Sequence, residues 1–164
     1  MKVIITSFAF LLLQLTVAPR IAIGEIAPDF PLLFVVYFSI YSGPLRGSVA
    51  GFLIGFIQDL FNPELLGVNA LTKTVLGYVM GYAGAKTESD HVVLLAAAFF
   101  VGALMHDFVY LLFFTGLAPL KFLALFFTKA LPSALYTAVA GVLVHAAISL
   151  LGIKVVRPLG KARS

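Results

Sequence analysis

Residues 46–81 read RGSVAGFLIGFIQDLFNPELLGVNALTKTVLGYVMG, two apolar segments joined by a short polar loop. Both segments carry small or polar residues at every fourth position, namely Gly47, Gly51, Gly55 and Asp59 in the first and Asn69, Lys73, Gly77 and Gly81 in the second. Residues four apart lie on one face of a helix, and small residues on such a face let two helix backbones approach closely. The stretch therefore predicts two antiparallel helices that pack through these faces.

Each of these predicted helices also has one charged residue toward the loop. At about 1.5 Å per residue, Asp59 lies roughly 4–5 Å and Lys73 roughly 9 Å from the loop end of its helix. We expect the two side chains to face each other or to share a polar partner, with Asn69 in the same polar clamp. A structural clamp is favoured over a coupling or ligand site, because nothing else in the stretch suggests chemistry.

The composition indicates an all-α membrane protein of one domain. Apolar residues are 62% of the 164 residues and charged residues are 11%, against about 45–50% and 25% in soluble domains. A soluble domain of this size could not bury so much apolar surface. The net charge of +4 then reflects basic residues on the cytoplasmic side of a membrane rather than nucleic-acid binding. The absence of Cys excludes disulfides and thiolate sites.

Six transmembrane helices are predicted, at about 3–18, 30–42, 45–61, 67–85, 92–115 and 131–153. A spanning helix needs roughly 17–25 apolar residues, so the second requires extension by its flanks or a locally thinned bilayer. The first could instead be a cleaved signal peptide, but no A-x-A site precedes Pro19. The segment 116–128 is too short to span and is expected to be interfacial or re-entrant.

The distribution of basic residues predicts that both termini are cytoplasmic. With the N-terminus inside, the cytoplasmic side holds Lys2, Arg46, Lys86, Lys154, Arg157, Lys161 and Arg163, and the outer side holds Arg20, Lys121 and Lys129. This excess follows the positive-inside rule. The basic tail at 154–164 then lies against anionic headgroups of the inner leaflet.

Three further polar residues, His106, Asp107 and His145, fall inside predicted spans. Because adjacent helical residues point about 100° apart, His106 and Asp107 are not expected to form a preorganised pair. A proton relay through Asp59, His106, Asp107 and His145 is an alternative to plain buried polar groups. No HExxH motif, nucleophile elbow or phosphate-binding loop is present, so we predict no catalytic residue, no metal and no cofactor.

The hairpin resembles a known family. The runs that carry the resemblance are 46–60 (RGSVAGFLIGFIQDL), 66–73 (LGVNALTK) and 77–78 (GY), preceded by 28–31 (PDFP) and 43–46 (GPLR). They are similar to MreD, the rod shape-determining membrane protein of bacteria. The specific motif covers about 28–85, and length and hydropathy match over the whole chain.

The resemblance implies a non-enzymatic scaffold in the inner membrane that binds MreC and helps position side-wall peptidoglycan synthesis. Indirect partners would be MreB, RodA and a class B penicillin-binding protein. The small-residue helix faces would suit the binding of another transmembrane helix. The implied fold resembles the six-helix substrate-binding subunits of energy-coupling-factor transporters.

That fold supplies the alternative function, a vitamin-binding subunit of a membrane transporter. A vitamin pocket requires a defined polar set on the outer half of the bundle, and the sequence offers few outer-loop polar or aromatic groups. An intramembrane enzyme, the third interpretation, lacks a catalytic constellation.

Overall fold

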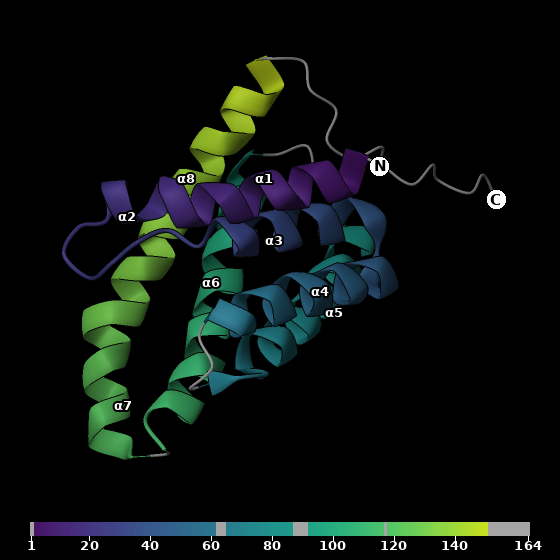
Figure 1. Cartoon of the computed structure of the whole chain (residues 1–164). Coiled ribbons are helices and arrows are strands. Elements are labelled where there is room, and N and C mark those ends of the chain that lie inside the picture. Colours follow the sequence, from purple (N-terminus) through teal and green to yellow (C-terminus); the bar gives the residue numbers. More distant parts are fainter. Residues whose placement is uncertain (1, 62–64, 87–91, 117, 151–164) are drawn as a thin grey trace.

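The computed structural model describes residues 2–61, 65–86, 92–116 and 118–150, and it is helical almost throughout (Figure 1). The elements are α1 (Lys2–Thr16), α2 (Ala18–Ile21), α3 (Phe30–Ser42), α4 (Pro44–Phe61), α5 (Val68–Lys86), α6 (Val92–Phe114), α7 (Pro119–Leu125), the π-helical turn η2 (Phe126–Ala130) and α8 (Leu131–Leu150). Among these residues the only β pairing is an isolated bridge between Ile23 and Ile26. The all-helical prediction is confirmed.

Helix α3 forms the centre of the molecule. It packs against α1, α4, α5, α6 and α8, and its Val35 and Val36 side chains are completely buried. Its 13 residues have the predicted limits and are not extended by their flanks. A helix of this length is typical of a buried core helix. Helix α3 is enclosed by other helices, and this explains why it is shorter than a lipid-facing span.

A single residue connects α3 to α4. Gly43 lies between Ser42 and Pro44 and adopts φ +88°, a left-handed conformation that only glycine adopts without strain. Its amide donates a hydrogen bond to the Ser39 carbonyl oxygen at 2.9 Å. This abrupt turn lays α4 directly beside α3 and places α5 against both.

Helices α4 and α5 pack through the two glycine stripes. A Cβ atom added to any stripe glycine would fall within 3.0 Å of facing backbone atoms; Gly51 would meet Lys73, Gly55 would meet Asn69, Gly77 would meet Gly47, and Gly81 would meet Gly43 and Pro44. Gly84, which the sequence analysis did not single out, has the same relation to Ile40 of α3. The stripes therefore lie inside the bundle, where they bring three helix backbones into contact.

Substitution of Gly51 by leucine is expected to destabilise the bundle by about 1–3 kcal/mol, because the side chain would overpack against the α5 backbone. The control is Val49→Leu on the same helix, where the side chain is 55% exposed. Thermal unfolding of both variants in detergent or nanodiscs provides the comparison. If Gly51→Leu were as stable as Val49→Leu, the close contact of α4 with α5 would be wrong.

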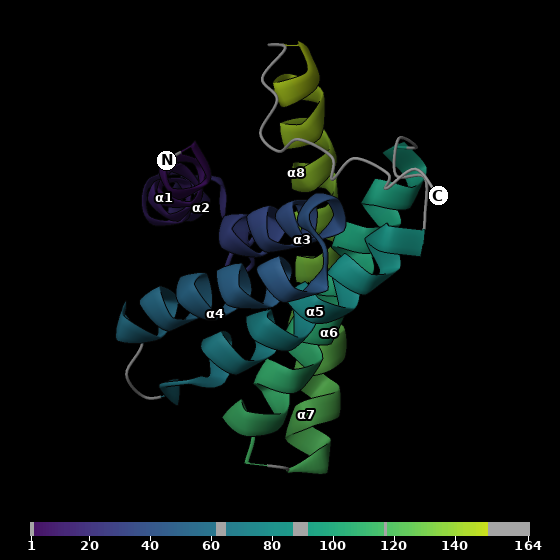
Figure 2. The same ribbon diagram turned by 90° about the vertical axis from the view of Figure 1, so that its right-hand side faces the viewer.

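Helix α6 and the run formed by α7, η2 and α8 lie side by side and cross the layer of α3, α4 and α5 steeply (Figure 2). The last 32 described residues, Pro119–Leu150, form one continuous helical run. The segment expected at 116–128 is therefore continuous with the last helix, and its interfacial position stays a prediction. Helix-forming residues follow Pro119 without interruption, and the ring of Phe122 packs on those of Phe108 and Phe126, so the segment joins the last helix instead of leaving it.

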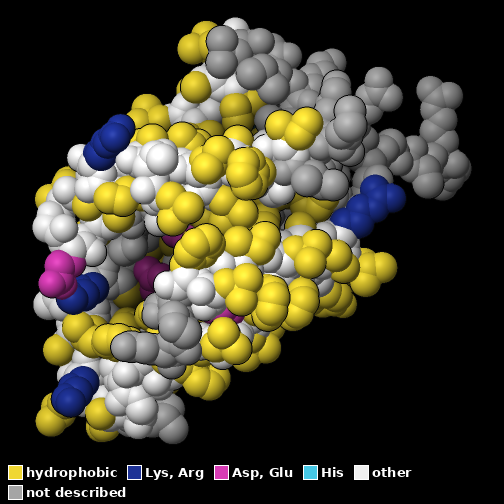
Figure 3. All heavy atoms as spheres, viewed as in Figure 1, with side chains coloured by type: hydrophobic (Ala, Val, Ile, Leu, Met, Phe, Trp, Pro, Cys, Tyr) yellow, Lys and Arg dark blue, Asp and Glu magenta, His cyan; other side chains and the backbone are white. Residues whose placement is uncertain are grey.

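Among the described residues, two helical runs are long and apolar enough to cross a membrane by length and composition, Val92–Phe114 and Pro119–Leu150. The other four predicted spans correspond to α1, α3, α4 and α5, which are shorter or carry charged residues. Apolar side chains cover most of the face drawn in Figure 3, as expected for contact with lipid. The basic tail predicted at 154–164 and the end of the sixth span lie outside the described residues.

Candidate functional site

A cluster of polar side chains lies where the loop ends of α4 and α5 meet the start of α3 and the second half of α6. It consists of Asp29, Asp59, Asn69, Lys73, His106 and Asp107. Charged groups inside a membrane protein are costly unless they are paired and hydrogen-bonded. The arrangement of hydrogen bonds therefore decides what each residue contributes.

Asp59 caps the start of α5 from the end of α4. Its Oδ1 accepts hydrogen bonds from the Asn69 backbone N–H at 3.1 Å and from Asn69 Nδ2 at 3.0 Å, and its Oδ2 accepts one from the Ala70 N–H at 2.9 Å. The residue is completely buried. A carboxylate at a helix N-terminus satisfies amides that have no helical partner and is favoured by the helix dipole. Asp59 thus locks the α4–α5 hairpin at its loop end.

Lys73 is also completely buried, and its ammonium group has three acceptors. Nζ lies 2.9 Å from Asp29 Oδ2, 3.0 Å from His106 Nε2 and 3.4 Å from Asn69 Oδ1. A lysine ammonium has three N–H donors, so each can be used. Lys73 therefore connects α5 to the start of α3 and to α6.

The counter-ion of Lys73 is Asp29, which the sequence analysis did not select. Asp29 is also the N-cap of α3, since its Oδ1 accepts from the Leu32 N–H at 2.9 Å. Burial acts to raise the pKa of Asp29, but the charge and hydrogen bond of Lys73, a smaller effect of His106 and the hydrogen bond from the Leu32 N–H together outweigh it, and the net pKa lies below the ordinary value. The signal available in the sequence was the run Pro28-Asp29-Phe30-Pro31, which has an N-cap residue followed by proline in the first turn.

Asn69 is the residue that links Asp59 to Lys73. Its amide nitrogen donates to Asp59, and its Oδ1 accepts from Lys73. Asp59 and Lys73 form no direct ion pair; they share a polar partner, which is the second of the two geometries expected from the sequence.

His106 and Asp107 do interact, which corrects the expectation that they would not. His106 Nδ1 lies 3.0 Å from Asp107 Oδ1. Their Cβ atoms diverge on α6, but the carboxylate is long enough to turn back to the near edge of the ring. His106 Nε2 lies 3.0 Å from the Lys73 ammonium, which can only donate, and 3.1 Å from Asn69 Oδ1. Because the ammonium is a full charge and has no acceptor atom, we assign the ring proton to Nδ1, so that a neutral His106 donates to Asp107.

His145 lies apart from this cluster. It is half-buried on α8, its ring is 5.9 Å from that of Tyr37, and its Nδ1 has no hydrogen-bond partner among the described residues. It lines a small cavity with Phe10, Phe99 and Gly141. The four residues considered for a proton relay are therefore not all joined, since hydrogen bonds through Asn69 and Lys73 connect Asp59 with His106 but do not reach His145.

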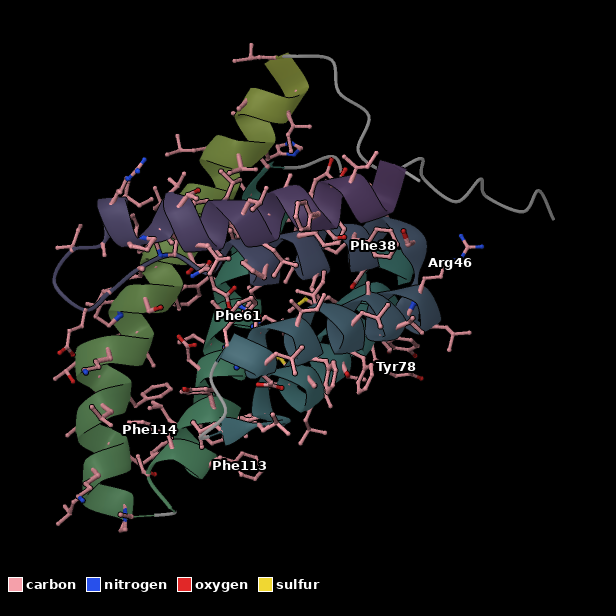
Figure 4. The ribbon with its side chains drawn as sticks, viewed as in Figure 1. Phe38, Arg46, Phe61, Tyr78, Phe113 and Phe114 are labelled. Carbon is pink, nitrogen blue, oxygen red and sulfur yellow. The ribbon has the colours of Figure 1, made fainter. Side chains whose placement is uncertain are left out.

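An open cleft of about 390 Å³ borders the polar cluster at Asp107. Its walls come from the loop before α3, from the last two turns of α6 and from the junction of α7, η2 and α8, and include Glu25, Asp107, Tyr110, Phe114, Lys129 and Ser133. Lys129 pairs with Glu25 across one side of the cleft. Figure 3 shows acidic atoms inside hollows of this mostly apolar face. In Figure 4, Phe114 points from α6 toward the α7–α8 run, whereas Phe113 points away from it.

Comparison with known proteins gives one result. No curated protein and no solved structure matches this chain. The family model described as rod shape-determining protein MreD matches residues 1–154, which include both glycine stripes, all six residues of the polar cluster and the whole lining of the cleft. The chain is therefore a membrane protein of the MreD family, with a role in determining rod shape.

Proposed function

We propose that this protein is a non-enzymatic, multi-pass scaffold of the bacterial inner membrane that binds MreC and thereby helps position side-wall peptidoglycan synthesis. MreB, RodA and a class B penicillin-binding protein would be reached through MreC. Membership of the MreD family supports the role in shape. The cleft beside Asp107 is the observation that carries the binding proposal.

The cleft is a better candidate for the binding surface than the glycine stripes, because the stripes are already packed against each other inside the bundle. Their small residues suggested that these stripes bind another transmembrane helix, but a Cβ atom on them would meet the backbone of α4 or α5. The cleft, by contrast, is open, and its lining combines aromatic walls with a few charged groups, as protein interfaces do at their centre.

The proposed mechanism is a bias on the conformation of MreC. A binding partner shifts an equilibrium only by its different affinities for the two states. If one arrangement of MreC fits the cleft and another does not, binding favours the first, and no covalent step is required. The rigid α4–α5 hairpin and the polar cluster would hold the walls of the cleft in place.

We also propose six spans with both termini in the cytoplasm, on the basis of the basic-residue asymmetry. This topology puts residues 25–27, the end of α6 and residues 125–133, which together line the cleft, on the outer side. Reporter fusions after Lys86 and after Arg163 should then report cytoplasm, and a fusion after Glu64 should report the outside. A cytoplasmic signal at Glu64 would contradict the topology.

The alternative function is a small-molecule-binding subunit of a transporter. The volume of the cleft supports it, since ligand pockets commonly enclose about 300–1,000 Å³. Depletion in a rod-shaped host separates the two functions. The scaffold proposal expects round, swollen cells whose shape no added vitamin restores. The transporter alternative expects rods whose growth defect is cured by one vitamin.

A further inference from the structure

Two carboxylates in the polar cluster, those of Asp59 and Asp107, have no opposite full charge beside them. Asp29 pairs with the Lys73 ammonium, and Asp59 is held by three N–H donors at the start of α5. Asp107 interacts with His106, whose ring is neutral in the assignment above, and among the described residues it has no Lys or Arg partner within ion-pair distance. The cluster therefore has an excess of negative charge, and Asp107 is the accessible part of it, because Asp59 is completely buried.

The carboxylate of Asp107 lines the cleft. Its side chain is 23% exposed and shares one face of α6 with Tyr110, Leu111 and Phe114 at helical spacing. At about 1.5 Å per residue, it lies roughly 10 Å below Phe114 at the end of α6. The carboxylate thus sits at the inner end of a cleft wall that is otherwise aromatic and aliphatic.

The other charges at the cleft cancel. Lys129 and Glu25 form an ion pair, and both are largely exposed, so they add no net charge at the surface. A carboxylate without a balancing cation in a poorly solvated site is unfavourable, and a positive group that bound beside it would relieve this cost.

Resting on the proposed binding of MreC, we propose that Asp107 is a subsite for one lysine or arginine side chain of the MreC segment next to the outer membrane surface. The long apolar stem of such a side chain can lie along Tyr110 and Phe114 while its charged end reaches the carboxylate. Aromatic walls also favour a nearby cation. A divalent metal fits less well, because Ca²⁺ takes six to eight oxygen ligands, and no group of three His, Cys, Asp or Glu among the described residues is arranged for a metal.

The test is the affinity of purified MreC for this protein in nanodiscs, at low and high salt. Asp107→Asn keeps the shape and the acceptor for His106 but removes the charge, and we expect it to weaken binding about tenfold or more. Asp90→Asn, a carboxylate on the predicted cytoplasmic side, is the matched control and should leave affinity unchanged. Wild-type binding should weaken with salt, and binding by Asp107→Asn should depend on salt less.

A charge exchange identifies the partner residue. Asp107→Lys should abolish binding, and changing one basic residue of the outer juxtamembrane segment of MreC to glutamate should restore it. Wild-type affinity in Asp107→Asn, or wild-type binding that is independent of salt, would overturn the cation subsite. The second criterion holds even if Asp107→Asn fails to fold. Failure of MreC to bind the wild-type protein at all would instead overturn the proposed function.

Discussion

Replacement of Lys73 by methionine is expected to reduce the free energy of unfolding by about 3–5 kcal/mol, the usual cost of leaving a buried charge without its partner. Methionine has nearly the length of lysine but no charge, so packing is largely preserved. Asp29, His106 and Asn69 would all lose a donor, and the Asp29 carboxylate would lose its counter-ion. Unfolding in detergent or nanodiscs measures the effect, and Lys121→Met, at an exposed position on α7, is the control.

A second substitution tests the pairing itself. Adding Asp29→Asn to Lys73→Met removes the Asp29 carboxylate charge that Lys73→Met leaves without a counter-ion. The double variant should therefore lose less stability than the two single variants lose together. Asp59 touches Lys73 only through Asn69, so Asp59→Asn and Lys73→Met should be more nearly additive. Full additivity of the Lys73 and Asp29 changes would contradict the ion pair.

Blocking the cleft is expected to abolish rod shape while leaving the bundle folded. Ser133→Trp introduces a large ring into the lining without removing a buried partner. Leu135→Trp is the matched control, because Leu135 lies two residues further along α8, is 55% exposed and does not line the cleft. In a depleted rod-shaped host, cells expressing Ser133→Trp should remain round, and cells expressing Leu135→Trp should recover rods.

The outcome has meaning only if both proteins accumulate to wild-type level in the membrane, which immunoblotting of membrane fractions checks. Rods in cells that rely on Ser133→Trp would show that shape does not depend on access to the cleft. Round cells with both variants would indicate a general intolerance of tryptophan on α8 rather than a role of the cleft.

The α4–α5 hairpin could be anticipated because its pattern is local. Glycine at every fourth position fixes one face of each helix, and a short loop brings the two faces together. The register, in which Gly51 meets the backbone of Lys73, comes from the structure. The same spacing predicted that Asp59 and Lys73 would share surroundings, since both lie near one loop. It could not choose between a direct pair and a bridge through Asn69, because a difference of one hydrogen-bond length is smaller than the precision of a helical count.

The rest of the site depends on contacts between distant segments. Asp29 precedes Lys73 by 44 positions, and His106 follows it by 33, and no periodicity connects them. The pairing of His106 with Asp107 depends on side-chain torsions, which the direction of the Cβ atoms does not determine. The cleft likewise arises from the crossing of α6 and α8 over the α3 layer, which hydropathy does not specify.

The most direct measurement for the proposed scaffold is the binding of purified MreC to this protein in nanodiscs, with Ser133→Trp and Leu135→Trp measured in parallel. The account predicts saturable binding to the wild-type protein and to Leu135→Trp, and loss of binding to Ser133→Trp. No binding to the wild-type protein, or equal binding to all three, would contradict it.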